Sequence, residues 1–591
     1  MKKNITKNSV SLFVAISICI SIFFSNWHYV KDFSEKKQIL VISWDVYGYY
    51  LYLPALFIYN DIGLQNMQWV EQIYEKYKPS TTYYQIADGE KGKKVIIYHY
   101  GMSILYAPAF IIAHTIAKFT AYPQDGFSNI YQLIFIINGI FFLWIGIFIL
   151  RRNLLHFFSD ILSAVILVLI VFGTNYYVTN GMSVTMPHNF MFALLGIILW
   201  FTIKWHQTYK IKYTILLGVA IGLAVVSRPT ELIVILIPLL WGATDAASFR
   251  EKIRLFKNHK PHLVAFFSSM AIIGLPQLIY WKYTSGSFFT FNLHSQTLSL
   301  LDPYTFNFLL SYKKGWLLYT PMVLFAIIGF WNMRKMNREI VLSFSSFFII
   351  TVYVLSSWEC WWYASSFSQR SMVESYALLA VPFGYFLKHN GESSLKIKWI
   401  MYSLIGFIFA LNIFQSWQYV NGIISMDRMT KKYYWRVFAK TSVTDDDRKL
   451  LEIERGTTIH ESFSDDESRY NTKQVFLLDF ENDTSEKNAR ALVDSFGFNS
   501  NFCFKLDNLI KFSPAYVGKY YDLTDKYYLW IRASADVFLT TTKSHSCLVV
   551  YLDSKKRLVK YRADGTEKLK LIPNQWNKIV IEYLTPEVRH S

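Results

Sequence analysis

Long hydrophobic runs, separated by short polar segments, fill most of the first 420 residues of the chain. A helix needs about 20 apolar residues, with a range of about 17–25, to cross the hydrocarbon core of a bilayer. The pattern therefore predicts a polytopic α-helical membrane protein with about 11–12 transmembrane helices. The runs are 10–26, 129–150, 158–174, 188–203, 213–227, 231–243, 262–281, 316–333, 340–357, 372–387 and 399–417.

Positive charge gathers in the short segments between these runs. Because basic residues favour the cytoplasmic side of a membrane, their positions place the amino terminus inside and the loops 175–187, 282–315 and 358–370 outside, together with everything after about Tyr419. The same clusters account for most of the net charge of +18, so we expect no nucleic-acid partner. The clusters are Lys2, Lys3 and Lys7; Arg151 and Arg152; Lys204, Lys210 and Lys212; and 250–260, 334–338 and 388–398.

Two runs need separate interpretation. The first, 10–26, follows basic residues and has no small-residue cleavage site after it, so we expect a retained signal anchor. The segment 101–119 is apolar but contains Pro108. Counting it as a full span would move Arg151 and Arg152 to the outer side. We therefore expect a re-entrant or interfacial segment there.

The pattern changes after Asp445, where charge rises and short alternating segments replace the long runs. Alternation with a period of two, interrupted by turn residues, predicts a β-sandwich. The expected division is a transmembrane domain at 1–430, a linker at 431–450 and an extracytoplasmic sandwich at 451–591. Three aspartates, 445–447, are interpreted as part of a solvated linker rather than a metal site. The expected strands are 474–480, 502–506, 527–535, 546–552, 557–561 and 578–583.

Cys503 and Cys547 share the predicted sandwich domain. A disulfide between them is possible if the domain faces an oxidising compartment, and the sequence leaves its formation open.

Asp45 is the first candidate for chemistry. It lies in WDVYGYYLYLP, just after the first hydrophobic run, among four tyrosines that include Tyr49. An ionised carboxylate close to a bilayer is costly unless it faces water or a polar cavity. Such a group can act as a general base toward a hydroxyl presented at the membrane surface. The alternative, a helix cap or a partner for a nearby lysine, has about the same weight.

Basic side chains in the outer loops are the next candidates. Lys313 and Lys314 precede a span on the side where lysine is unusual, which fits either snorkelling or an anionic head group. His99 and His188 each lie where the chain enters a hydrophobic run; a structural hydrogen bond is the more common role of such a histidine. Arg228, in SRPTE, is expected to pair with Glu231.

The segment WECWWYASSFSQRSMVE combines aromatic and charged residues. Trp358, Trp361 and Trp362 fit an interfacial aromatic belt or a substrate surface. Arg370 is expected to begin a helix in which Glu374, four residues later, orients its guanidinium. An oriented arginine can grip the oxygens of a lipid-linked phosphate in a bidentate way.

Taken together, these segments resemble bacterial GT-C glycosyltransferases. The similar groups are relatives of the lipopolysaccharide-core sugar transferases and of the protein O-mannosyltransferase superfamily. The resemblance covers about residues 10–420, in the order WDVYGYYLYLPALF, YHYGMSILYAPAFIIAH, SVTMPHNFMF, GLAVVSRPTELIV, LLSYKKGWLLYTPMVLFAIIGF and WWYASSFSQRSMVESYALLAVP. Two features depart from the family pattern. The first loop has no second acid beside Asp45, and SFSQR replaces the more usual SFGxR.

The resemblance implies an inverting transferase in a bacterial cytoplasmic membrane. It would use a polyprenyl-phosphate sugar and a glycan, lipid or protein acceptor on the extracytoplasmic side. Asp45 would be the base, and Arg370 would bind the donor phosphate with Lys313, Lys314 or His99. Tyr49, His188, Trp358, Trp361, Trp362 and Glu374 are weaker candidates for substrate binding.

No Walker loop, GxGxxG, GxSxG or HExxH motif is found. No cofactor is required, although a divalent metal stays open. The C-terminal domain resembles carbohydrate-binding modules and is expected to lack an edge strand.

Two alternative functions remain open. One is an oligosaccharide ligase or polymerase that uses a lipid-diphosphate donor. The other is a non-catalytic glycolipid transporter, for which the paired broken helices and internal symmetry of many transporters are not evident.

Overall fold

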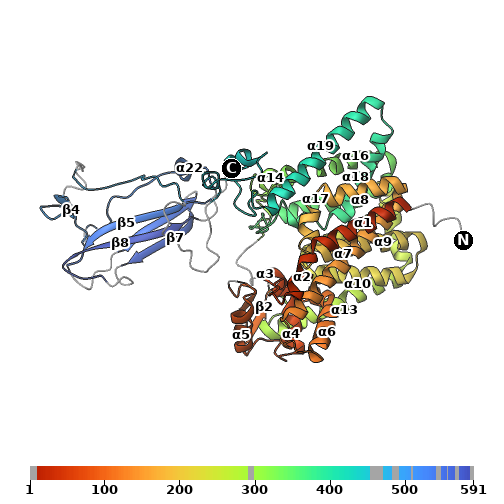
Figure 1. The fold of residues 1–591 in the computed structure, drawn as a ribbon, viewed down its shortest axis with the longest axis horizontal. Helices are drawn as coiled ribbons and strands as arrows, with labels where there is room; N and C mark the ends of the chain where they lie inside the picture. The colour runs from red at the N-terminus through yellow and green to blue at the C-terminus, as the bar shows by residue number, and fades with distance from the viewer. Residues whose placement is uncertain are drawn as a thin grey trace. The chain divides into compact units, whose positions relative to one another are not determined.

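The structure is a computed structural model, and it divides the chain into two units, Met1–Asp427 and Arg428–Ser591 (Figure 1). Each unit is described by itself. The described residues are 9–80, 82–290, 298–452, 470–481, 491–498, 500–507, 510, 512–526, 528–540, 547–554, 557–565 and 571–585.

The first unit is a bundle of helices. Its early part holds two helices that continue one another, α1 (Ser9–Ser25) and α2 (Trp27–Ser34), and a small region of short elements that ends at Lys118. That region contains α3 (Trp44–Tyr50), α4 (Tyr52–Phe57), α5 (Met67–Tyr77), the antiparallel pair β1 (Ile86–Asp88) and β2 (Lys94–Ile96), and α6 (Gly101–Lys118).

The longer of the remaining helices of the bundle follow the predicted hydrophobic runs, whereas Tyr177–Gly181, Ala246–Asn258 and Thr305–Leu310 lie between those runs. They are α7 (Asn129–Phe157), α8 (Asp160–Phe172), the π-helix η2 (Tyr177–Gly181), α9 (Pro187–Thr208), α10 (Ile211–Ser227), the 3₁₀ segment η3 (Pro229–Ile235), α11 (Leu236–Leu240), α12 (Ala246–Asn258), α13 (Lys260–Ser285), α14 (Thr305–Leu310), α15 (Trp316–Tyr319), α16 (Val323–Met336), η4 (Arg338–Ile340), α17 (Val341–Ser356), η5 (Arg370–Met372), α18 (Tyr376–Gly391) and α19 (Leu395–Val420).

The prediction of a polytopic helical membrane protein is confirmed. In the described part of the chain, seven helices are long and apolar enough to cross a membrane, and shorter apolar helices accompany them. Only 11% of the apolar window of α13 or of α19 is buried within the protein, so the exposed surface suits contact with lipid. By contrast, 78% of the window of α9 is buried, which makes it a central helix.

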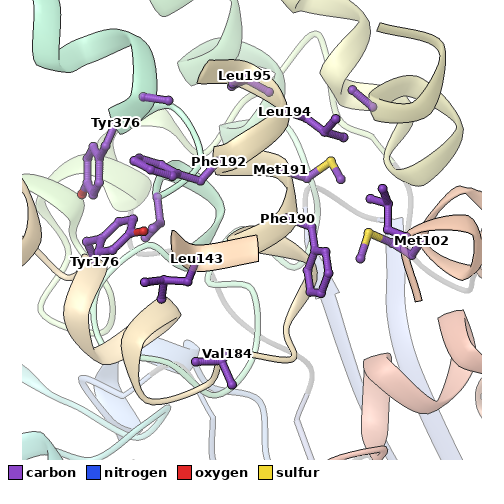
Figure 2. Close-up of a cluster of buried hydrophobic side chains, with 14 of the residues drawn as sticks. Met102, Leu143, Tyr176, Val184, Phe190, Met191, Phe192, Leu194, Leu195 and Tyr376 are labelled. Carbon is purple, nitrogen blue, oxygen red and sulfur yellow. The ribbon is translucent and has the colours of Figure 1, made fainter. Parts of the chain in front are cut away.

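The centre of the bundle is packed around α9. Figure 2 shows Phe190, Met191 and Phe192 of α9 among side chains from other segments, including Leu143 of α7 and Tyr376 of α18. Bulky side chains on several faces of α9 are fully enclosed, which is the pattern of a helix surrounded by other helices.

The contacts of α1 with α7 settle the path of the chain around α6. Arg151 Nε, near the end of α7, donates to Ser11 Oγ, near the start of α1, at 2.8 Å. Asn129 Oδ1, at the start of α7, accepts from the backbone of Ile39, just beyond α2, at 3.1 Å. Since α1 and α7 run in opposite directions, the chain between them starts and ends at the same end of the bundle. However, α6 is itself one of the seven helices long and apolar enough to cross a membrane, so the re-entrant or interfacial placement of 101–119 stays a prediction.

The second unit contains short helices and antiparallel strands. The strands pair as β3 (Leu492–Asp494) with β4 (Phe502–Phe504), β5 (Trp530–Phe538) with β8 (Trp576–Leu584), and β6 (Cys547–Ser554) with β7 (Arg557–Gly565). The helices are α20 (Lys431–Val437), α21 (Asp445–Arg448) and α22 (Tyr520–Leu523).

Alternation explains the strand positions. In β8, Ile579 and Ile581 are buried while Lys578 and Val580, which alternate with them, are exposed, as the period of two predicts. The predicted strand at 474–480 is wrong, because those residues form no strand.

Two further expectations for this unit need correction. Asp447 is not solvated: it is 1% exposed and accepts hydrogen bonds from Arg436 Nε at 2.8 Å and Lys440 Nζ at 2.7 Å. Cys503 and Cys547 are both free, so the disulfide that the sequence left open is not formed.

Candidate functional site

Asp45 lies in the first turn of α3, where the backbone is held from both sides. Trp44 has a left-handed φ of +52°. Its amide donates to the carbonyl of Pro79 at 2.9 Å, and its carbonyl accepts from Gln85 Nε2 at 3.1 Å. A left-handed non-glycine residue is costly and persists only where surrounding contacts hold it. The positive end of the helix dipole also favours a carboxylate at this position.

Three donors converge on the Asp45 carboxylate. Arg370 Nη2 contacts Oδ2 at 2.9 Å, while the hydroxyls of Tyr98 and Tyr84 donate to Oδ1 at 2.6 and 3.0 Å. Burial by itself raises the pKa of Asp45, but the charge of Arg370 and the three hydrogen bonds outweigh it and hold the pKa below its usual value. Asp45 is therefore ionised in this state and a weak base.

Arg370 has unused hydrogen-bonding capacity. Its side chain is 16% exposed, and its Nε atom is buried with no hydrogen-bond partner among the described residues. A buried donor without an acceptor is costly and points to a missing partner. The guanidinium therefore has a donor available for an incoming anion.

The expected pairing of Arg370 with Glu374 is wrong. Residues 370–372 form a 3₁₀ turn and α18 begins only at Tyr376, so the α-helical spacing that brings positions four apart together is absent. Arg370 contacts Asp45 instead, and Glu374 contacts Arg228 and His188.

Glu374 is the centre of a second, buried cluster. Arg228 Nη1 donates to its Oε1, and His188 Nδ1 lies 2.9 Å from its Oε2. The expected Arg228–Glu231 ion pair is also wrong, because Arg228 is in an extended conformation before η3, at φ −147° and ψ 110°, and reaches Glu374 instead. Glu231 nevertheless lies close by, lining a small cavity together with Glu374 and Ser371.

Tyr49 stands between the two clusters. Its ring packs edge-on against Tyr98, with 4.6 Å between centroids. Burial raises the pKa of Tyr49 to about 12, and its hydroxyl also feels the charges of Arg228, Asp45, Arg370 and Glu374. Tyr49 therefore lies near both the Asp45–Arg370 pair and the buried Glu374 cluster.

Lys313 and Lys314 are both enclosed by the protein. Lys314 is 1% exposed; its ammonium donates to the carbonyls of Ser366 and Met426 and to Ser366 Oγ. Burial is the main cause that lowers the pKa of Lys314 well below its usual value. The ammonium of Lys313 lies 3.8 Å from the ring centroid of Trp362 and 5.9 Å from that of Trp361. Phosphate binding by either lysine stays a prediction.

The other aromatic candidates lie around these groups. The ring of Trp358 packs against Tyr363 at 5.3 Å, and its backbone bridges to Leu298. The ring of His99 contacts Trp281 of α13 edge-on at 5.3 Å. Sequence reasoning missed Tyr84 and Tyr98 as partners of Asp45, because tyrosines are common throughout this loop. It also missed Arg228 as the partner of Glu374.

Comparisons with known proteins give no family for the chain. No family model matches the sequence, and no curated protein sequence matches it. Two solved structures from Archaeoglobus fulgidus are similar to it. The apo oligosaccharyltransferase has a TM-score of 0.41 and 12% identity, with 78% of this chain and 62% of that chain covered. Oligosaccharyltransferase AglB in complex with an inhibitory peptide and a dolichol-phosphate has a TM-score of 0.36 and 14% identity, with 77% and 61% covered.

The chain thus spans only about three fifths of the length of those oligosaccharyltransferases. At such low TM-scores and identities, neither likeness carries an argument about the fold or the chemistry of this chain. The interpretation of the site rests on its own geometry.

Proposed function

We propose that this chain is a membrane glycosyltransferase. It moves a sugar from a polyprenyl-phosphate donor to an acceptor hydroxyl of a cell-envelope glycan, lipid or protein, with inversion. The observation that carries the proposal is the Asp45–Arg370 pair at one end of a lipid-exposed bundle. A base and an anion-binding group, 325 residues apart in the chain, meet there at 2.9 Å.

The donor phosphate would compete with Asp45 for Arg370. A phosphate can engage two N–H groups of a guanidinium at once, and Nε supplies a donor that has no partner in the described structure. Once Arg370 turns toward the phosphate, the effect of burial on Asp45 is less opposed. Its pKa then rises, and the carboxylate becomes a better base. Donor binding and base activation are therefore coupled.

Sugar transfer forms one bond, breaks one bond and moves one proton. The acceptor oxygen forms a bond to C1 of the sugar as the bond between C1 and the phosphate oxygen breaks. The proton of the acceptor hydroxyl passes to Asp45, and the lipid phosphate leaves with the bonding electrons beside Arg370. Attack from the face opposite the leaving phosphate inverts the anomeric centre.

The proposed location follows from the bundle and the charge pattern. A lipid-linked donor can approach through the apolar surface of the helices while its phosphate stays at the end where Asp45 lies. The basic clusters at the opposite end favour the cytoplasmic side, which supports a site on the extracytoplasmic side of a cytoplasmic membrane as part of the proposal.

Mass spectrometry of cell-envelope glycans tests the proposal. Cells without the gene should lack a sugar that the parental gene restores and that Asp45→Asn does not. If the Asp45→Asn protein, present in the membrane at the parental level, restored the sugar fully, the enzyme assignment would fail. A non-catalytic transporter would account better for that result.

A further inference from the structure

Helix α12 lies at the end of the bundle opposite Asp45. The central helix α9 starts at the Glu374 cluster, where His188 is its second residue, and its 22 residues extend about 33 Å at ~1.5 Å per residue. Near its other end, His206 Nε2 contacts Lys252 Nζ of α12. Helix α12 is therefore remote from the proposed active site.

One face of α12 is fixed to the bundle. Lys252 is 6% exposed and donates to the carbonyl of Trp241 at 2.9 Å. Its ammonium lies 5.1 Å from the ring centroid of Phe256 and 5.6 Å from that of Trp205. Burial lowers the pKa of Lys252 to about 7, so this face holds less positive charge than its sequence suggests. Asp245 fixes the start of the helix through a capping box with Ser248.

The other face combines exposed apolar and basic side chains. Phe249 and Ile253, four residues apart and hence on one face, are each 41% exposed. Arg250, Arg254 and Lys257 are also exposed, and none of the three forms an ion pair within the described residues. Exposed apolar side chains beside unpaired positive charge are typical of helices that lie in a membrane interface.

We infer that α12 lies on the membrane surface and binds anionic phospholipid head groups. Phe249 and Ile253 would enter the boundary between head groups and acyl chains, while Arg250, Arg254 and Lys257 would contact lipid phosphates. Charge complementarity identifies the partner, since each basic residue near an anionic surface strengthens binding about fivefold at moderate salt. This inference is independent of the proposed function, because α12 lies at the other end of the bundle.

Hydrogen–deuterium exchange on the full chain tests the inference. The protein would be placed in nanodiscs of phosphatidylcholine, with or without phosphatidylglycerol. Peptides covering 246–258 should take up deuterium at least about threefold more slowly when phosphatidylglycerol is present. The effect should weaken at high salt, because the contacts are exposed charges.

Two variants with the same change of charge sharpen the test. In Arg250→Gln/Arg254→Gln/Lys257→Gln, the effect of phosphatidylglycerol on 246–258 should disappear. It should persist in Lys505→Gln/Lys519→Gln/Lys578→Gln, which removes three exposed lysines from the second unit. An equal exchange rate for the parental protein in both lipids would overturn the inference, whether or not the variants fold. Persistence of the effect in the α12 variant would also overturn it.

Discussion

The two arginine–carboxylate pairs at the Asp45 end of the bundle differ in how much of each pair is exposed to solvent; we call the more exposed one the open pair and the other the closed pair. In the open pair, the side chains of Asp45 and Arg370 are 27% and 16% exposed, and one guanidinium nitrogen has no partner in the described structure. In the closed pair, the side chains of Glu374 and Arg228 are 3% and 12% exposed, and His188 adds a further contact. A guanidinium–carboxylate contact is thus exchangeable in the open pair and fixed in the closed pair.

The difference follows from the cost of desolvation. A closed ion pair has already lost its water, so removing one member leaves an uncompensated buried charge. The open pair keeps access to solvent, and a substrate anion can replace one partner without stranding the other. We therefore expect changes in the open pair to affect activity and changes in the closed pair to affect stability first.

The largest expected effect is on the rate, from Asp45→Asn. This change keeps the shape of the side chain but removes the proton acceptor, and losing a general base costs about 10²–10⁴ in rate. Steady-state transfer by the purified protein measures it. Glu71→Gln is the matched control, because it neutralises an exposed carboxylate of α5, in the segment that follows α3 and α4. Parental kcat in Asp45→Asn would show that another group acts as the base.

The next effect is on stability, from Glu374→Gln. Arg228 then loses its carboxylate inside the protein, and breaking a buried pair costs about 3–5 kcal/mol. Thermal unfolding in detergent should show a clear fall in Tm. Asp88→Asn is the control, since Asp88 is 88% exposed in its pair with Lys94 and such pairs contribute about 0–1 kcal/mol. Equal shifts for the two variants would contradict the distinction between closed and exposed pairs.

The hydrophobic runs of the bundle could be predicted because the lipid bilayer imposes them. A membrane requires long apolar helices whatever their partners are, so each predicted run coincides with helical structure. The placement of 101–119, inferred from Arg151 and Arg152, stays a prediction because its helix is also long and apolar enough to cross a membrane. In the second unit, alternation found β5 to β8 but placed a strand at 474–480 where none forms.

Ion-pair partners were harder to predict because they depend on tertiary contacts. The sequence pointed to Asp45 and Arg370 separately, but no local pattern joins residues 325 positions apart. Glu374 and Glu231 were assigned their nearest basic neighbours on the assumption of α-helical spacing. The backbone is 3₁₀ or extended at those points, so the side chains diverge.

A smaller effect is expected on donor binding, from Arg370→Lys. Lysine keeps the charge but loses the planar fork, so one charge-assisted hydrogen bond to the phosphate is lost. The donor KM should rise about tenfold, equivalent to ~1.4 kcal/mol, with little change in Tm. Arg338→Lys, at the opposite end of the bundle, is the control. An unchanged donor KM for Arg370→Lys, with a lowered Tm, would assign Arg370 a purely structural role.

The smallest expected effect is a shift in pH dependence, from Tyr98→Phe. The Tyr98 hydroxyl donates to ionised Asp45 at 2.6 Å and is one of the contacts that lower its pKa. Without this bond the pKa of Asp45 rises, so the carboxylate binds a proton at a higher pH and ceases to act as a base there. The acidic limb of kcat/KM should therefore move to higher pH, by about one unit or less.

Tyr98→Phe should also change how the stability of the fold depends on pH. A carboxyl whose pKa is lowered on folding stabilises the fold at neutral pH, and that contribution is lost as the pH falls through the folded pKa. Tyr98→Phe reduces the contribution, so Tm should change less between neutral and acidic pH than in the parental protein. Tyr83→Phe is the control, since Tyr83 packs against Tyr74 instead of Asp45. If the acidic limb of kcat/KM in Tyr98→Phe stayed in place or moved to lower pH, Tyr98 would not be one of the groups that lower the pKa of Asp45.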